Sequence, residues 1–180
     1  MKLLTPGQAR ELDRVSMGDM GISTEKLMGN AGKQVAKEAM EMVSDIHDSS
    51  ILILCGKGNN GGDGFAAATV LFENNYNVRI HSLCKNNVIK GDSLNFYLKC
   101  ESLGIFTTFG ELLADFKIPD LIIDGLLGTG FKGALRKSMT PWVEWINNSK
   151  SLVLSIDISS GLNGNSGRVN PIAVKANTTV

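Results

Sequence analysis

Short apolar runs alternate with amphipathic stretches along most of the chain. The apolar runs are rich in Ile, Leu and Val: Ile51–Cys55, Val78–Cys84, Leu121–Asp124 and Leu152–Ile158. Continuous runs of this kind are typical of strands that are covered on both faces. Amphipathic stretches with helical character lie between them: Gly61–Asn75, Gly91–Leu103 and Pro141–Asn148. The alternation predicts βαβ units and an α/β fold with a mainly parallel sheet.

Two further helices are predicted before the first strand, over Pro6–Met17 and Thr24–Met42. Ser23 or Thr24 is a plausible cap for the second of them. Its apolar positions recur at helical spacing: Leu27, Ala31, Val35 and Ala39. This apolar face predicts a helix that packs on the sheet. The alternative is a subunit interface formed by the methionines of this region: Met17, Met20 and Met28.

Composition and charge narrow the class of protein. The 180 residues favour a single domain, and 43% of them are hydrophobic, as in a globular protein. Lys plus Arg equals Asp plus Glu at 18 each, so the net charge predicts no nucleic-acid partner and no anionic membrane surface. No run approaches a membrane span, and the first residues do not resemble a signal or transit peptide. Three cysteines without metal-type spacing predict reduced thiols in a cytoplasmic protein.

Three predicted strands end in polar, glycine-rich loops, and ligands of open parallel sheets bind beyond the carboxyl ends of the strands. The first loop, "CGKGNNGGDGFAAA", runs from Cys55 to Ala68 and leads into a helix start. Backbone N–H groups at such a start attract anions. Asp63 can cap this helix, but a cap alone does not require Asn59, Asn60 and the additional glycines. We therefore expect a ligand-binding loop.

The second loop, "DGLLGTGFKG", spans Asp124–Gly133. Its residues Gly128–Gly133 match G-x-G-x-x-G, which by itself is a weak signal, because a dinucleotide fingerprint opens a helix directly. The next clear helix start is at Thr140 and Pro141. The loop is long enough to wrap a ligand. Lys132 either meets a phosphate or is a solvated surface lysine.

The third loop, "SIDISSGLNGNSG", spans Ser155–Gly167. Asp157 stands at a strand end, where it is placed for chemistry or caps the following turn. Oxygen atoms of Asn60, Asp124 and Asp157 are expected to converge on one crevice. Hard cations prefer such ligands. The low total charge favours a monovalent ion over a divalent one.

Four motifs in this order resemble the NAD(P)H-hydrate epimerase family, also called the YjeF N-terminal domain: "LMGNAG" at 27–32, "CGKGNNGGDGF" at 55–65, "DGLLGTGFKG" at 124–133 and "SIDISSGLNGNSG" at 155–167. The resemblance implies one domain over 1–180 with a Rossmann-like three-layer α/β/α sandwich. It implies interconversion of the R and S forms of hydrated NADH or NADPH, which carry a hydroxyl at C6 of the reduced nicotinamide ring. It also implies a potassium ion, a homodimer and functional coupling to a separate ATP- or ADP-dependent dehydratase.

Site residues carry over from the resemblance position by position. The implied potassium ligands are Asn60, Asp124 and Ser160. Asp157 is implied to contact the substrate near the reacting centre. The implied substrate-binding residues also include two segments: Asn59, Asn60, Gly61, Gly62 and Asp63, and Gly128, Thr129, Gly130, Phe131, Lys132, Gly133 and Ala134.

Two departures from the family pattern are visible. The family usually has proline at the position of Ser159, and serine lacks the fixed φ of proline, so a looser loop is expected. The chain stops at "VKANTTV", where family members continue through further strands, so we expect a shortened domain or a sheet without one edge. No dehydratase domain is encoded in these 180 residues.

A mechanism follows from the substrate that the family implies. The ring nitrogen can help to expel hydroxide from C6, and water can return from the other face. A carboxyl group that protonates the hydroxyl and deprotonates the water assists both steps, by typically 10²–10⁴-fold. Asp157 is the predicted group, and it needs a pKa raised by burial.

Three alternatives remain open at this point. One is an NAD(P)-dependent dehydrogenase, since Asp157 follows Gly133 by 24 residues, near the spacing of a ribose-binding acid. Another is a non-catalytic nucleotide- or RNA-binding scaffold, because a domain of mRNA-decapping proteins shares the fold. The last is a subunit that is active only beside a separate dehydratase.

Overall fold

The computed structural model describes residues 4–112 and 116–180. Its centre is a six-stranded parallel sheet with the order β3-β2-β1-β4-β5-β6. The strands are β1 (Ser50–Cys55), β2 (Asn77–Ser82), β3 (Thr107–Phe109), β4 (Leu121–Gly125), β5 (Leu152–Ser155) and β6 (Thr178–Thr179). The helices are α1 (Pro6–Gly18), α2 (Thr24–Met42), α3 (Asn59–Glu73), α4 (Asp92–Ser102) and α5 (Thr140–Asn148), with a short 3₁₀ turn, η1 (Asn86–Val88).

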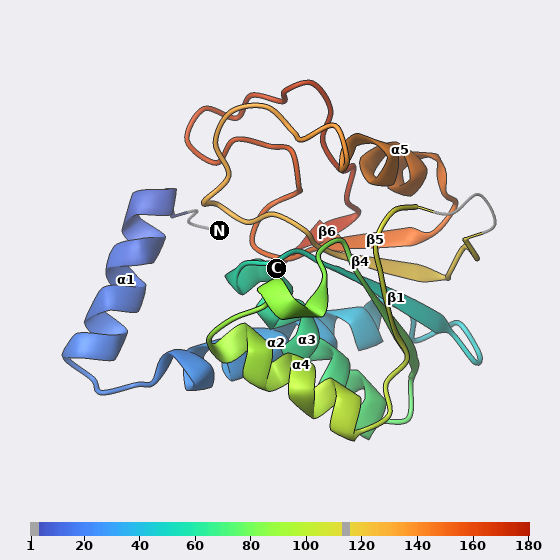
Figure 1. Cartoon of the computed structure of the whole chain (residues 1–180), viewed down its shortest axis with the longest axis horizontal. Helices are drawn as coiled ribbons and strands as arrows, with labels where there is room; N and C mark the ends of the chain where they lie inside the picture. Colours follow the sequence, from blue (N-terminus) through green and yellow to red (C-terminus); the bar gives the residue numbers. More distant parts are fainter. Residues whose placement is uncertain (1–3, 113–115) are drawn as a thin grey trace.

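Helices cover both faces of the sheet, as the apolar runs predict. On one face, α2, α3 and α4 pack through a core that includes Val35, Phe65 and Ile53. On the other face, α5 packs through Trp142 and Val143 onto alternate residues of the same strands (Figure 1). The expected three-layer α/β/α sandwich with two N-terminal helices is therefore confirmed.

The sheet differs from the sequence prediction at its edges. The strands β3 and β6 were not predicted, because they are only three and two residues long and mainly threonine. Two predicted strands are also shorter than expected, since β2 ends at Ser82 and β5 at Ser155. Beyond β5 the chain turns at Asp157, whose φ is +65°.

The two N-terminal helices behave differently. Ser23 caps α2 by accepting a hydrogen bond from the Lys26 backbone N–H, and Met28 of this helix is buried. In contrast, α1 stands apart from the sandwich (Figure 1), and its region exposes Met17 and Met20 at 37% and 68%. The packing prediction therefore holds for α2, and the exposed methionines belong to α1 and the turn after it. Within the described residues, no helix is long and apolar enough to cross a bilayer.

Candidate active site at the carboxyl edge of the sheet

A cavity of about 790 Å³ lies at the carboxyl ends of the strands. The chain passes from β1 to β2 on one side and later places β4 on the other side of β1. Ligands of doubly wound sheets bind at this reversal of strand order. The walls come from α1, α2, the start of α3, the loop after β4 and the loop after β5. All three glycine-rich loops that the sequence singles out therefore border this cavity.

The first loop enters the helix earlier than predicted. Helix α3 begins at Asn59, and its N-cap is Gly58, which has no side-chain cap. Asp63 thus lies within the helix, and the alternative in which Asp63 caps this helix is excluded. Its carboxyl group instead lines the cavity. Burial, followed by the negative charges of Asp157 and Asp13, raises the pKa of Asp63 to about 7.

The two glycines between Asn60 and Asp63 do not line the cavity. A side chain at Gly62 would lie 2.4 Å from Ser93 Oγ and 2.6 Å from Met28 Cε. The absence of a side chain at Gly62 therefore allows α3 to approach α2 and α4. The expectation that Gly61 and Gly62 lie against the ligand is not supported by this arrangement. "LMGNAG" at 27–32 belongs to α2, where Met28 takes part in this packing and Ala31 lines the cavity.

Asp124, at the end of β4, is fully buried and well hydrogen-bonded. The Ser160 hydroxyl donates to Asp124 Oδ1 at 2.6 Å, and the Ser160 N–H donates to Oδ2 at 2.9 Å. Ser155 Oγ and the Leu126 N–H donate to the same carboxylate at 3.0 and 3.3 Å. Burial raises the pKa of Asp124, and these hydrogen bonds partly counteract the rise. Within the described residues, no Lys, Arg or His forms an ion pair with Asp124.

Asn60 joins this cluster through Leu127. Its side-chain amide donates to the Leu127 carbonyl at 2.9 Å, and Ser160 Oγ lies 3.3 Å from the same carbonyl oxygen. The Leu127 N–H donates to Ser160 Oγ at 2.9 Å. The three residues predicted to hold a cation therefore meet around one loop. Among the described residues, no group of three or more His, Cys, Asp or Glu side chains is arranged to hold a metal ion. A carboxylate, a hydroxyl, an amide and a carbonyl suit a weakly charged ion.

Asp157 lies on the cavity wall at the turn after β5. Its Oδ2 accepts a hydrogen bond from the Thr129 N–H at 2.6 Å. A side chain at Gly128 would lie 2.7 Å from this oxygen and 3.3 Å from Asn60 Oδ1, so the loop after β4 requires glycine there. Asp157 is exposed, so the burial that a proton donor at this position would need is not present. Burial acts instead on Asp63, which the sequence offers as a possible helix cap and which the resemblance implies is a substrate-binding residue.

Most of the predicted substrate-binding residues line the cavity: Asn59, Asn60, Asp63, Gly128, Thr129, Gly130, Phe131 and Asp157. The others lie outside its lining: Gly61, Gly62, Lys132, Gly133 and Ala134. The basic side chains in the lining are Arg10 and Lys57, which the sequence analysis missed. Lys57 stands inside "CGKGNN", where it could have been found. Arg10 gives no local signal, because only the position of α1 brings it to the cavity.

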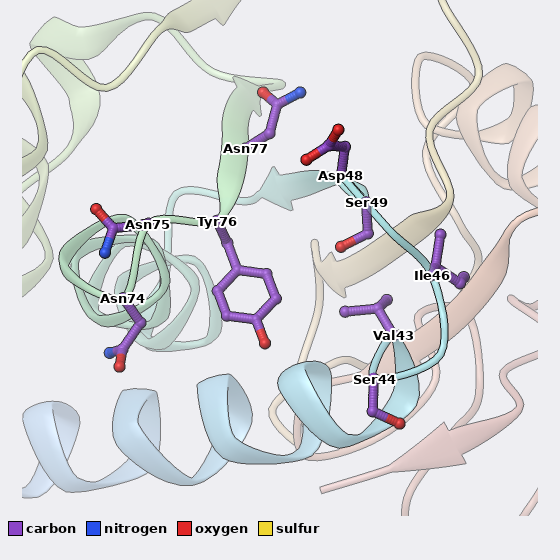
Figure 2. A pocket seen from close by; sticks show the side chains of 9 residues that line it. All are labelled: Val43, Ser44, Ile46, Asp48, Ser49, Asn74, Asn75, Tyr76 and Asn77. Carbon is purple, nitrogen blue, oxygen red and sulfur yellow. The ribbon is translucent and has the colours of Figure 1, made fainter.

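A second cavity, of about 470 Å³, lies near the opposite edge of the sheet. Figure 2 shows that its lining comes from the end of α2 with the turn before β1, and from the connection between α3 and β2. Its titratable groups are Asp48 and Tyr76. None of the glycine-rich motifs reaches it. The carboxyl-edge cavity is therefore the candidate active site.

Comparisons with known proteins show which proteins this chain resembles. An NAD(P)H-hydrate epimerase of Elusimicrobium minutum is 31% identical over 186 residues, which cover 99% of this chain and 84% of that protein. A bifunctional NAD(P)H-hydrate repair enzyme Nnr of Coxiella burnetii is 36% identical over 174 residues, which cover 96% of this chain and 35% of the relative. The crystal structure of the yeast protein YNL200c matches the fold with a TM-score of 0.87 at 19% identity, covering 99% of this chain and 79% of that one.

The sequence model of one family, described as YjeF-related protein N-terminus, matches residues 24–180. This range includes every glycine-rich loop of the cavity and leaves out α1. The chain therefore belongs to the YjeF-related protein N-terminus family.

Proposed function

We propose that the chain is an isomerase that interconverts the R and S forms of hydrated NADH and NADPH. The observation that carries the proposal is one cavity at the reversal of strand order, where Asn60 from the start of α3, Gly128 from the loop after β4 and Asp157 from the turn after β5 come together. Relatives that cover nearly the whole chain are named NAD(P)H-hydrate epimerase. The reaction repairs a damaged nicotinamide cofactor.

The dehydrogenase alternative is less well supported. A dinucleotide fingerprint places its glycines at the start of a helix. In this chain, Gly128–Gly133 are followed by a loop, and α5 begins only at Thr140. The G-x-G-x-x-G match is therefore part of a long cavity loop and lends no support to hydride transfer.

The substrate carries a diphosphate, so basic groups are needed near it. Arg10 of α1 and Lys57 of the loop after β1 line the cavity and supply two positive charges. The first N–H groups of α3 add the partial positive charge of a helix N-terminus. We infer that these groups bind the phosphates. Lys132, proposed for this role from sequence, lies outside the lining.

Asn60, Asp124, Ser160 and the Leu127 carbonyl are the inferred potassium ligands. Asp124 supports this inference, because its buried carboxylate has no ion-pair partner in the described part of the chain. A bound potassium ion would supply a positive charge that offsets this carboxylate near a polyanionic substrate. We infer that the potassium ion would organise the loops after β4 and β5, and that side chains carry out the proton transfers.

The proposal extends to partners and location. The exposed apolar residues of α1 and its flanks, Leu4, Leu12 and Met20, support a homodimer formed by this helix. Light scattering at micromolar concentration should give twice the mass of the chain, and a monomer mass would refute the dimer.

Relatives named as bifunctional repair enzymes support coupling to a dehydratase. The free thiols of Cys55, Cys84 and Cys100 support a reducing compartment such as the cytoplasm.

The function is tested with one purified epimer of NADPH hydrate. Chromatography should show the other epimer forming much faster with protein than in buffer, in potassium more than in a bulky organic cation. The absorbance band of reduced nicotinamide should not appear, since no hydride is transferred. Conversion at the buffer rate would refute the proposed function.

A further inference from the structure

Three carboxyl groups line the cavity: Asp13 from α1, and Asp63 and Asp157 from segments that carry the glycine-rich motifs. Asp63 projects from α3, and Asp157 from the turn after β5. Only Asp157 is singled out by its position at a strand end. The structure adds Asp63, because α3 begins at Asn59 and turns residue 63 toward the cavity.

The two carboxyl groups differ in how they are held. Asp157 Oδ2 accepts the Thr129 N–H, so this carboxylate is fixed against the loop after β4. Asp63 is half-buried, and no hydrogen bond or ion pair holds its carboxyl group among the described residues. A half-buried carboxyl group without a structural partner is available to a ligand.

The charged groups around Asp63 set its protonation. Asp13 and Arg10 face the cavity from α1, Lys57 from the loop after β1 and Asp157 from the turn after β5. The Cys55 thiol is fully buried, and burial, with a smaller contribution from the charge of Asp63, raises the pKa of that thiol well above its ordinary value. The pKa of Asp63 is about 7, with burial as the first cause and Asp157 as the second. Asp63 therefore holds a proton about half of the time at neutral pH.

The chemistry of epimerisation has a use for two such groups. Hydroxide leaves C6 from one face of the ring, and water must add to the opposite face. A proton is needed at the departing oxygen, and a base is needed at the incoming water on the other side. One carboxyl group cannot reach both faces without movement of the ring.

We propose that Asp63 and Asp157 act from opposite faces of the nicotinamide ring as a proton-transfer pair that works with one shared proton. This inference rests on the proposed function. The Asp63 carboxyl gives its proton to the C6 hydroxyl, the C–O bond breaks with help from the nitrogen lone pair, and water leaves. A second water forms a C–O bond on the other face and gives its proton to Asp157. The reverse reaction exchanges the two roles, and solvent exchange returns the proton to Asp63.

The test uses solvent enriched in oxygen-18 and three variants: Asp63→Asn, Asp157→Asn and Asp48→Asn. Asp48 is a matched control, because its φ is also positive, at 54°, and it lies near the opposite edge of the sheet. Epimerisation should fall roughly 10²–10⁴-fold in each active-site variant and stay unchanged in the control. Each active-site variant keeps one carboxyl group, which can expel and return water on its own face.

Labelled oxygen should therefore enter the starting material without inversion, and in opposite epimers for Asp63→Asn and Asp157→Asn. In the wild type, kcat/KM in both directions should fall tenfold per pH unit above about pH 7, since Asp63 then loses the shared proton. In the Asp63→Asn variant, kcat/KM should not show this decrease above about pH 7. Its circular dichroism and its affinity for NADPH should match the wild type, which separates a lost proton donor from a lost fold.

The possible outcomes separate the two claims. A wild type that converts neither epimer overturns both the proposed function and this inference. An active wild type whose Asp63→Asn variant keeps its rate and the same decrease in kcat/KM with pH overturns only the role of Asp63. Labelled oxygen that enters the same epimer in both variants overturns the division of the two faces.

Discussion

Replacing Asp63 by Asn should stabilise the fold, and the gain should grow with pH. The folded chain raises the pKa of Asp63 from its ordinary 3.8 to about 7, chiefly by burial. The folded state therefore binds this proton more tightly than the unfolded chain does. As the pH rises from about 4 to about 7, the unfolded chain releases the proton first, and the free energy of unfolding falls. Asn carries no charge and avoids this loss.

The size of the effect follows from the two pKa values. Relative to low pH, where Asp63 is protonated in both states, the free energy of unfolding is lower by about 1.5 kcal/mol at pH 5 and by about 4 kcal/mol at pH 8. The advantage of Asp63→Asn over the wild type should therefore be about 2.5 kcal/mol larger at pH 8 than at pH 5. For a chain of this size, that corresponds to roughly 5–10 °C in Tm.

The assay is urea unfolding followed by circular dichroism at both pH values. Asp45→Asn is the control, because Asp45 is exposed in the turn after α2 and should give differences within about 0.5 kcal/mol. An advantage of Asp63→Asn that is equal at both pH values would refute the assigned environment of this carboxyl group. A variant less stable than the wild type at pH 8 would refute it as well.

Three further predictions concern the rest of the site. Asp157→Asn should lower epimerisation by about 10²-fold or more with nucleotide affinity unchanged; an unchanged turnover number with weaker binding in steady-state kinetics would make it a binding residue. Asn60→Ala should weaken nucleotide binding and reduce its dependence on potassium. Nucleotide affinity measured in potassium and in a bulky organic cation tests this. If the wild type and the variant lose affinity by the same factor when potassium is replaced, Asn60 is not a potassium ligand. Gly62→Val should cost about 1–3 kcal/mol by overpacking against Met28 while leaving nucleotide affinity unchanged in the folded fraction, as thermal unfolding and equilibrium dialysis can check.

The sequence predicts the central strands because they are buried on both faces. Ile51–Cys55 and Leu121–Asp124 are continuous apolar runs, and both became strands with little change in bounds. The edge strand Thr107–Phe109 has no such run, since it is only partly covered and its pairing with β2 is set by tertiary contacts. Local pattern therefore finds the strands of the core and misses those at the edges.

The candidate site also contains residues that local sequence pattern can find and residues that only the tertiary fold brings to the cavity. Asn60, Asp124 and Asp157 could be placed together from sequence, because carboxyl ends of parallel strands meet at one edge of a sheet. The proposed proton-transfer role of Asp63 could not be predicted from sequence. The direction of its side chain depends on where helix α3 begins, four residues earlier. Arg10 could not be found either, because only the position of α1 relative to the sheet brings it to the cavity.

The most direct measurement approaches the equilibrium of the two epimers from both sides. Wild-type protein with potassium is mixed with each purified epimer of NADPH hydrate in solvent enriched in oxygen-18, and both epimers are followed by chromatography and mass spectrometry. We expect both reactions to reach one ratio of epimers much faster than in buffer alone, with solvent oxygen in every inverted molecule. Inversion at the buffer rate, or inversion that keeps the original oxygen, would contradict this expectation.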